Sequence, residues 1–485
     1  MKIAAAIAFA ASSVAGAVAQ SPIGAFGQCG GDVYVGSTSC IQGYECHFYS
    51  EYYSQCLPVA ASDSSANLVK ASGIESTSAK RTTTSAPATK TTTKKPKTTS
   101  AVPTTTKKPK PSTATPTAAP TEDPTAPTDV PTTETPTEVP TKKPTPSSSA
   151  PTPAGCTLTG TYVSGTDVSS CSSVVISSLQ VPAGVTLDLT KLKDGATVTF
   201  TGTTTFGTKL WEGPLILLTG TNLKVTGPGT LNGQGEWYWP QGQSVTRPVF
   251  FRLTHVEKST LSGFTLKNSP FRTFSVLNSV NTVITGLTLD SKAGNGQAKN
   301  TDGFDLSRNN GVSITNNTVY NQDDCLAMQS SVNTLFAYNS CTGGHGVSIG
   351  SIGGAAVDSS DTVNGLTVTN NKIIDNTNGL RIKTIIDLKG LVTNVKYIDN
   401  TLTNVKNAIV MHSDYSKAKG GYVGTPTSQV TISDITISGL TGTATNLYDV
   451  VANPSVVSNW NWSGINVQAT SKGSCKGQPS GVTCA

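Results

Sequence analysis

The chain has few charged residues, few aromatic residues and no cluster of metal-binding side chains. Of its 485 residues, 13% are charged and 6% are aromatic. Its four histidines are scattered along the sequence, and its ten cysteines include no pair with C-x-x-C spacing. Zinc and related metals need clustered ligands, so this pattern argues against a metal centre. We therefore expect no metal and no cofactor.

Long apolar runs are missing after the first residues. The chain starts with Met1-Lys2, continues with an apolar run to Val18 and has Ala17-Val18-Ala19 as an A-x-A site. This arrangement is typical of a secretory signal peptide, which we place at residues 1–19. No later stretch approaches the roughly 20 apolar residues that cross a bilayer. The protein is therefore predicted to be secreted and extracellular, with no membrane partner.

The positive charge is concentrated in one segment. The formal charge of the chain is +6, and residues 60–154 contain twelve Lys and Arg against seven Asp and Glu, a net charge of +5. The segment has no Phe, Tyr or Trp, whereas nucleic-acid surfaces combine basic with aromatic residues, so we expect no nucleic-acid partner. Its Thr, Pro, Ser and Lys composition predicts a disordered, extended linker over residues 59–154.

The segment before this linker is short and rich in cysteine. Residues 21–58 contain Cys29, Cys40, Cys46 and Cys56. So few residues cannot bury a sufficient apolar core, and the segment is predicted to depend on disulfides. The even number of cysteines in an exported chain predicts five disulfides in all. The other six cysteines are Cys156, Cys171, Cys325, Cys341, Cys475 and Cys484.

Residues 155–485 show short alternating segments in place of helix-length apolar periods. Examples are residues 281–284, 312–314 and 366–368, each followed by a turn marked by Gly or Asn. The segments recur about every 20 to 30 residues, as in stacked coils. Stacking buries strands that are half exposed in one coil alone. We predict an all-β fold, a right-handed parallel β-helix; a sandwich or propeller would need antiparallel hairpins with two-residue turns.

Four polar motifs interrupt these repeats. They are Asn300-Thr301-Asp302-Gly303-Phe304-Asp305, Asn321-Gln322-Asp323-Asp324-Cys325, Gly343-Gly344-His345-Gly346 and Arg381-Ile382-Lys383. Asp302 and Asp323 are 21 residues apart, and so are Asp324 and His345. Coils of that length would stack these residues on one face. We expect them to meet in one cleft.

The three acids fit the hydrolysis of a glycosidic bond. This reaction needs a carboxylic acid that protonates the leaving oxygen and a carboxylate that activates water. Crowded carboxylates cannot all ionise easily, so at least one pKa should rise and keep a proton available. A structural alternative is that Asp302 and Asp305 only cap a turn or form a calcium loop.

The basic pair indicates an anionic substrate. Arg381 and Lys383 alternate along a predicted strand and should project to the same side. A guanidinium binds a carboxylate through two parallel hydrogen bonds, and an ammonium adds a point charge. The alternative is a solvated strand face, which is less favoured because the acids are expected on neighbouring coils.

Taken in order, the four motifs resemble the signature of the polygalacturonases, glycoside hydrolase family 28. The resemblance covers residues 155–485 and implies a parallel β-helix, inversion at the anomeric carbon and a pectin or polygalacturonate substrate. It also implies the disulfides Cys156–Cys171, Cys325–Cys341 and Cys475–Cys484. Rhamnogalacturonan hydrolases of this family lack the full Gly-His-Gly and Arg-Ile-Lys pattern, which favours homogalacturonan.

The resemblance also assigns roles to individual positions. It implies that Asp323 is the general acid and that Asp302 and Asp324 hold the attacking water. For an inverting site we expect about 6.5 to 9.5 Å between the acid and base carboxyls. His345 would support the acid, and the implied substrate-binding residues are Asn300, Arg381, Lys383 and Tyr415.

Residues 21–58 resemble a family 1 carbohydrate-binding module of the fungal type. The resemblance rests on Cys29-Gly30-Gly31 and on residues 52–56, Tyr-Tyr-Ser-Gln-Cys. It implies the disulfides Cys29–Cys46 and Cys40–Cys56, and cellulose binding through Phe26, Tyr52, Tyr53 and Gln55. Phe26 departs from the usual Trp or Tyr, and in a structural alternative these aromatics serve only the module's own core.

These observations predict a secreted hydrolase of α-1,4-galacturonosyl bonds, endo-acting and monomeric, that is targeted to plant cell wall by a cellulose-binding module. The alternatives are a catalytically silent wall-binding protein, an exo-polygalacturonase and a rhamnogalacturonan hydrolase. Asn316 and Asn461 stand in N-x-S/T sequons and are candidate glycosylation sites.

Overall fold

The computed structural model describes residues 22–23, 28–30, 37–50, 53–59 and 156–484. The predicted signal peptide, Phe26, Tyr52 and the linker beyond Val59 lie outside the described residues. Tyr53 and Gln55 belong to a described strand, but their side chains lie outside the described part. No helix in the described part is long and apolar enough to span a membrane.

The N-terminal module is a small antiparallel sheet held by two disulfides. Its strands are β1 (Gln28–Gly30), β2 (Tyr44–Ser50) and β3 (Tyr53–Pro58), in the order β1-β3-β2. Cys29–Cys46 and Cys40–Cys56 are the pairings that the resemblance implies. Cys29 and Cys56 are almost fully buried, so the disulfides form the centre of this module.

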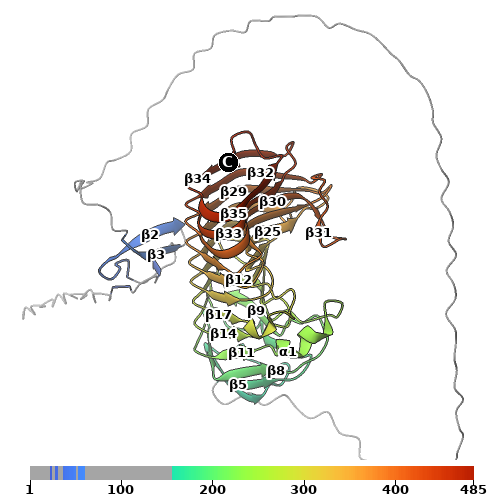
Figure 1. Ribbon diagram of the computed structural model, residues 1–485. Coiled ribbons are helices and arrows are strands. Elements are labelled where there is room, and N and C mark those ends of the chain that lie inside the picture. The colour runs from blue at the N-terminus through green and yellow to red at the C-terminus, as the bar shows by residue number, and fades with distance from the viewer. Residues whose placement is uncertain (1–21, 24–27, 31–36, 51–52, 60–155, 485) are drawn as a thin grey trace, which may run out of the picture. The chain divides into compact units, whose positions relative to one another are not determined.

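Residues 156–484 form the predicted parallel β-helix, whose strands stack in three columns (Figure 1). The first column starts with β4 (Thr157–Thr161) and β5 (Ser173–Val181). It continues with β7 (Thr197–Thr201), β10 (Lys224–Thr226), β13 (Thr260–Ser262), β16 (Val283–Thr285), β20 (Ser313–Thr315), β23 (Ser331–Ala337), β26 (Thr362–Thr369), β29 (Lys389–Ile398), β32 (Gln429–Ser438) and β34 (Val457–Ser463). The short strand β19 (Asn309–Asn310) pairs with the start of β23.

The second column runs beside the first. It comprises β8 (Thr203–Phe206), β11 (Thr230–Asn232), β14 (Thr265–Lys267), β17 (Thr288–Asp290), β21 (Thr318–Tyr320), β24 (Ser340–Thr342), β27 (Lys372–Ile374), β30 (Thr401–Ser416), β33 (Thr441–Val451) and β35 (Asn466–Lys476). The long strands β30 and β33 also extend into the third column.

The third column carries the polar motifs. It comprises β6 (Leu187–Leu189), β9 (Ile216–Thr221), β12 (Phe251–Glu257), β15 (Phe274–Leu277), β18 (Phe304–Ser307), β22 (Leu326–Met328), β25 (Val347–Ile352), β28 (Asn378–Ile385) and the second half of β30. The remaining elements are α1 (Gly235–Tyr238), the 3-10 turns η1 (Trp239–Gln241) and η2 (Lys292–Gly294), and β31 (Gly421–Tyr422), which pairs antiparallel with β30.

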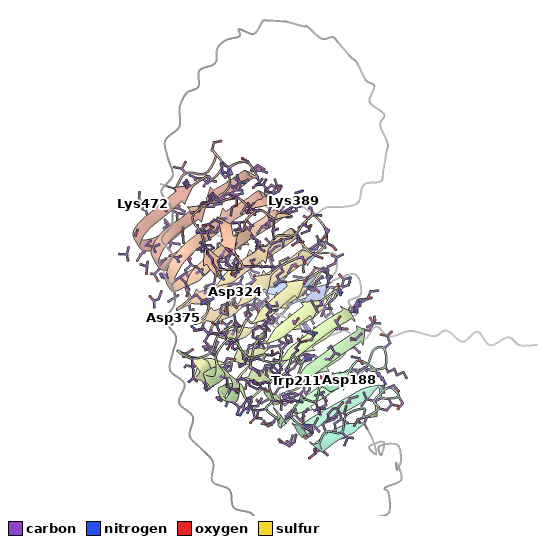
Figure 2. All side chains as sticks on the ribbon, turned by 90° about the vertical axis from the view of Figure 1, so that its right-hand side faces the viewer. Asp188, Trp211, Asp324, Asp375, Lys389 and Lys472 are labelled. Atoms are coloured by element: carbon purple, nitrogen blue, oxygen red, sulfur yellow. A yellow bond between two sulfur atoms is a disulfide. The ribbon has the colours of Figure 1, made fainter. Side chains whose placement is uncertain are left out.

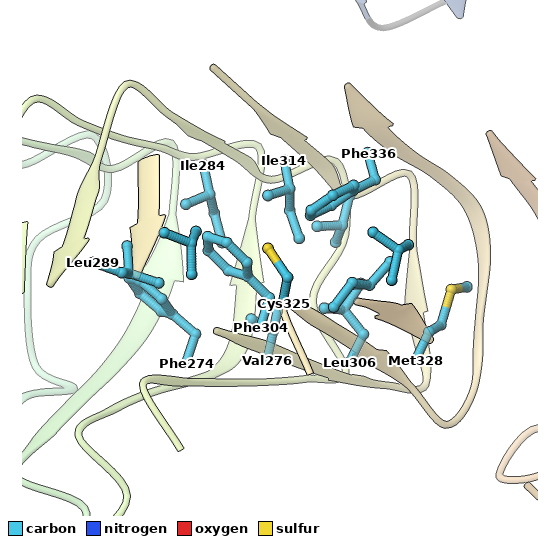
Figure 3. Packing of buried hydrophobic residues seen from close by; sticks show 14 of the residues in the cluster. Phe274, Val276, Ile284, Leu289, Phe304, Leu306, Ile314, Cys325, Met328 and Phe336 are labelled. Atoms are coloured by element: carbon cyan, nitrogen blue, oxygen red, sulfur yellow. The ribbon is translucent and has the colours of Figure 1, made fainter. Parts of the chain in front are cut away.

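Like side chains stack on one another inside the coils (Figure 3). Phe274 lies between Phe251 and Phe304, with both ring centroids 5.4 Å away and the planes tilted by 21° and 11°. All three rings are fully buried. Full burial of one such side chain contributes about 1.5 to 3 kcal/mol, so the repeated inward positions hold the stack together.

Asparagines form a ladder at one corner of the coils. The Oδ1 atoms of Asn339, Asn371 and Asn400 each accept the backbone N–H of the ladder residue one coil earlier, at 2.8 to 3.1 Å. The preceding corner residues Asn370 and Asp399 have φ of 55° and 53°, a left-handed conformation that Asn and Asp tolerate. The ladder satisfies buried polar groups at the turns.

The remaining three predicted disulfides are also present. Cys156–Cys171 and Cys475–Cys484 lie at the two ends of the β-helix, and Cys325–Cys341 lies in its middle. Cys325 follows Asp324 directly and is fully buried. The middle disulfide thus ties together the coils that carry Asp324 and His345.

Candidate active site

The third column brings the predicted acids together. Phe304 pairs in register with Leu326, and Leu326 pairs with Val347. Asp302, Asp323 and His345 each precede these aligned residues by two or three positions. In this register Asp302 stands opposite Asp324, 22 residues further on, and Asp324 stands opposite His345, 21 residues further on, so the motifs stack on one side of the β-helix. Figure 2 views this side, with Asp324 near the middle of its length.

Asp323 is held by three hydrogen-bond donors. His345 Nδ1 lies 2.9 Å from its Oδ1, which also accepts the backbone N–H of Asp324 at 2.9 Å. Asn300 Nδ2 donates to its Oδ2 at 3.3 Å. Burial raises the pKa of Asp323, but the hydrogen bond and charge of His345 outweigh it and lower the pKa to about 2.

Asp324 is fully enclosed by cations and a hydroxyl. Its Oδ1 accepts hydrogen bonds from Ser348 Oγ, at 2.8 Å, and from Arg381 Nη2. Its Oδ2 accepts Lys383 Nζ at 3.0 Å. Only 2% of the Asp324 side chain is exposed. These contacts supply the partners that a buried acidic side chain needs.

Asp302 and Asp305 are the carboxyls of the cluster whose pKa values are raised. Burial and the charges of neighbouring carboxylates raise the pKa of Asp302 well above its usual range. Burial also raises the pKa of Asp305 to about 7, although Arg272 opposes this. Arg272 Nε lies 2.9 Å from Asp305 Oδ2 without hydrogen-bond alignment, which limits the compensation. The predicted rise of a carboxyl pKa is present, but on these residues and not on Asp323.

The distance between the acid and base carboxyls stays a prediction. Asp323, Asp324 and His345 each offer one ligand atom, and these atoms lie within 4.8 Å of one another. This limit joins single atoms of each residue, so it does not measure the expected 6.5 to 9.5 Å between the acid and base carboxyl groups.

The same three residues have the chemistry of metal ligands, but their atoms are already in use. Both oxygens of Asp324 accept hydrogen bonds from Ser348, Arg381 or Lys383. A metal ion there would compete with two fixed cations.

Arg381 and Lys383 project from β28 toward the acids, as predicted. Arg381 is 9% exposed, and its Nε also donates to Ser348 Oγ at 2.8 Å. Lys383 Nζ lies 5.7 Å from the ring centroid of Tyr415. The two cations, the acids and Tyr415 therefore form one continuous site, and the alternative of a solvated strand face is wrong.

Several residues of the site were missed by sequence reasoning. Ser348 joins Asp324 to Arg381 and stands in register with Arg381, so alternation along β25 was the available signal. Arg247 Nη2 and Gln243 Nε2 both donate to Asn300 Oδ1 at 3.2 Å and hold it beside Asp323. Neither lies in a recognisable motif, and no signal marked them.

The two sequon asparagines differ in exposure. Asn461 is exposed on β34, and Asn316 is half-buried at a coil corner with φ of 57°. Glycosylation at either position stays a prediction.

Fold and site together define a class of protein: a parallel β-helix with an acid and cation cluster suited to cleaving glycosidic bonds of an anionic polysaccharide. Residues 171–484 match the family model "Glycosyl hydrolases family 28", and the chain belongs to this family. Residues 25–53 match the model "Fungal cellulose binding domain".

Characterised relatives agree with this assignment. Endopolygalacturonase B of Aspergillus niger is 42% identical over 341 residues, which cover 68% of this chain and 92% of the relative. The polygalacturonase of Cochliobolus carbonum is 42% identical over 342 residues, with the same coverage of both chains.

Two solved structures are similar. Endopolygalacturonase I from Stereum purpureum, complexed with two galacturonates, has a TM-score of 0.53 and 28% identity, covering 64% of this chain and 98% of its own. The endo-xylogalacturonan hydrolase from Aspergillus tubingensis has a TM-score of 0.57 and 28% identity, covering 68% and 98%.

Proposed function

We propose that the protein is a secreted endopolygalacturonase that hydrolyses α-1,4-galacturonosyl bonds in pectin. The observation that carries this proposal is the contact of Asp324 with Arg381 and Lys383 beside the Asp323–His345 pair. The names of the family 28 relatives support the same reaction. The silent wall-binding alternative is disfavoured because the acids, the histidine and the basic pair are all in place.

Asp323 is proposed as the general acid. Its side chain is 16% exposed, against 2% for Asp324, so it is the more accessible to a leaving oxygen. His345 Nδ1 lies 2.9 Å from Asp323 Oδ1 and is proposed to hold the acid in position. Because the pKa of Asp323 is lowered to about 2 without substrate, the acid role requires that sugar binding raises this pKa and loads the carboxyl with a proton.

Asp324 and Asp302 are proposed to hold the attacking water. Asp324 lies between its two cations, and its occupied oxygens disfavour covalent attack on the sugar. Once the Asp302 carboxyl has ionised in the substrate complex, it can receive the proton of the water. Direct attack by a water gives inversion of the anomeric centre.

Arg381, Lys383, Asn300 and Tyr415 are proposed to bind substrate. Arg381 has five N–H donors, and its contacts with Ser348 and Asp324 leave donors for a galacturonate carboxylate. Lys383 adds a second charge, and Tyr415 lies next to it.

The N-terminal module is proposed to bind cellulose and so to keep the enzyme on plant cell wall. The match of residues 25–53 to a cellulose-binding family supports this role. We place the module at residues 21–58 and the catalytic domain at 155–485, joined by residues 59–154 and preceded by a secretion signal at 1–19.

The test is the release of reducing ends from polygalacturonate, with xylogalacturonan and rhamnogalacturonan as parallel substrates. We expect polygalacturonate to be cleaved fastest, with an early fall in viscosity that marks endo action. Proton NMR of the first product should show the inverted anomer. Faster cleavage of another polymer, monomer release from chain ends or a retained anomer would each overturn the corresponding part of the proposal.

A further inference from the structure

A second polar cluster lies one coil beyond Arg381 and Lys383. His412 pairs in register with Lys383 and is 4% exposed. Its Nδ1 lies 2.6 Å from Asp414 Oδ1, and its Nε2 lies 3.0 Å from Asp449 Oδ1. Burial lowers the pKa of His412, but the two carboxylates outweigh it and raise the pKa. An imidazolium fixed at both nitrogens cannot rotate without losing an ion pair.

This imidazole packs against an exposed tyrosine. The ring of Tyr422 lies parallel to the His412 ring, with centroids 3.7 Å apart and planes 16° apart. Tyr422 belongs to β31, which pairs with the end of β30. Asp414 fixes the same hairpin on its other side, because its Oδ2 accepts the backbone N–H of Gly424 at 2.6 Å. The hairpin is therefore anchored through the His412 cluster.

Tyr422 also reaches the basic pair. Partial burial raises the pKa of its phenol to about 12, while the charge and hydrogen bond of Arg381 act in the opposite direction. The residue is nevertheless 39% exposed, against 9% for Arg381. Tyr422 lies 6.0 Å from Tyr415, ring to ring, in an edge-to-face arrangement. Figure 1 shows β31 on the same side of the β-helix as α1.

We propose that Tyr422 is a further substrate-binding residue and that His412, Asp414 and Asp449 position it. The inference rests on the proposed function, since it assigns the bound group as a galacturonate unit. An exposed aromatic ring beside a guanidinium suits an anionic sugar, because the ring packs on the sugar face while the cation pairs with the carboxylate. The fixed imidazole holds the ring in place before substrate arrives, which lowers the entropic cost of binding.

The experiment measures KM and kcat on polygalacturonate for the full chain and its variants. Tyr422→Ala is expected to raise KM about tenfold, with a much smaller change in kcat, and Tyr422→Phe is expected to raise it less. The matched control is Tyr397→Phe, which removes a buried hydroxyl that has no hydrogen-bond partner among the described residues. This control should leave KM unchanged.

His412→Gln tests the positioning role. It is expected to raise KM, as Tyr422→Ala does. The KM of the double variant is expected to be no higher than that of Tyr422→Ala alone. A purely structural role for His412 would make the two effects add in the double variant and would overturn this assignment. An unchanged KM in Tyr422→Ala, while the parent enzyme cleaves polygalacturonate, overturns the inference alone. A parent enzyme without activity on polygalacturonate overturns the proposed function.

Discussion

The acid half of the site (Asp302, Asp323 and Asp324) and its cation half (Arg381 and Lys383) are built on different coils. The acid half stands on two short coils, in which Phe304 pairs with Leu326 and Leu326 with Val347. The cation half follows a longer coil, in which Val347 pairs with Leu380. Backbone register places both halves, and side chains support both. In the proposed mechanism the acids handle the reacting protons and the cations bind the substrate, so the two halves should respond differently to substitution.

Asp323→Asn in the acid half should have the largest effect. Loss of the proton donor is expected to lower kcat on polygalacturonate by about three to four orders of magnitude. Fluoride leaves without protonation, so an oligogalacturonosyl fluoride should recover much of the rate. Reducing-end release and fluoride release measure the two cases.

The control for this variant is Asp188→Asn, an exposed residue near the N-terminal end of the same strand column. It should leave both rates unchanged. Full activity of Asp323→Asn on polygalacturonate would show that another carboxyl, with Asp302 first among them, donates the proton.

Arg381→Lys in the cation half should have the second largest effect. Lysine cannot reproduce the planar contacts to both Ser348 and Asp324, so kcat/KM is expected to fall about a hundredfold. Steady-state kinetics measure this change. The control is Arg308→Lys, which alters an exposed arginine at a coil corner and should have no effect. Equal activity of Arg381→Lys and the parent enzyme would mean that only the charge matters.

His345→Gln should have an intermediate effect on the acid half. The variant keeps a hydrogen-bonding side chain but loses the imidazole beside Asp323. We therefore expect kcat to fall about ten- to fiftyfold with little change in KM. The pKa of Asp323 should rise because the interaction that lowers it is gone. Carboxyl titration by NMR would report that rise, and an unchanged titration would contradict the pairing.

Asp305→Asn should have the smallest effect on catalysis and a visible one on stability. The raised pKa of Asp305, about 7 against an ordinary 3.8, means that the folded protein keeps a proton that the unfolded chain releases between these values. The free energy of unfolding should therefore fall as pH rises from about 4 to 7, by at most about 1.4 kcal/mol per pH unit from this group. Urea unfolding across this range measures the slope.

Asp305→Asn should flatten this slope. A slope equal to that of the parent protein would place the responsible proton elsewhere, for example on Asp302.

Sequence reasoning located the acid half well because short coils, whose registers are 22 and 21 residues, convert the spacing of the motifs into stacking. It also gave the five disulfides and the parallel β-helix. It could not give the supporting contacts of either half, because Arg247 beside the acids and Ser348 and Tyr422 beside the cations are single residues brought in by register or by loops. It predicted that at least one carboxyl pKa rises but not which one, since the spacing of motifs says nothing of which carboxyl receives the donors of His345 and Asn300.

The Cys325–Cys341 disulfide lies in the interior of the coils, with both cysteines fully buried. A reductant in solution cannot touch this bond while the strands above and below remain paired. At a saturating concentration of reductant, the rate of inactivation should therefore equal the rate at which these coils open. The inactivation rate then reports how fast the coils open. Above a saturating concentration of reductant, adding more should not increase this rate.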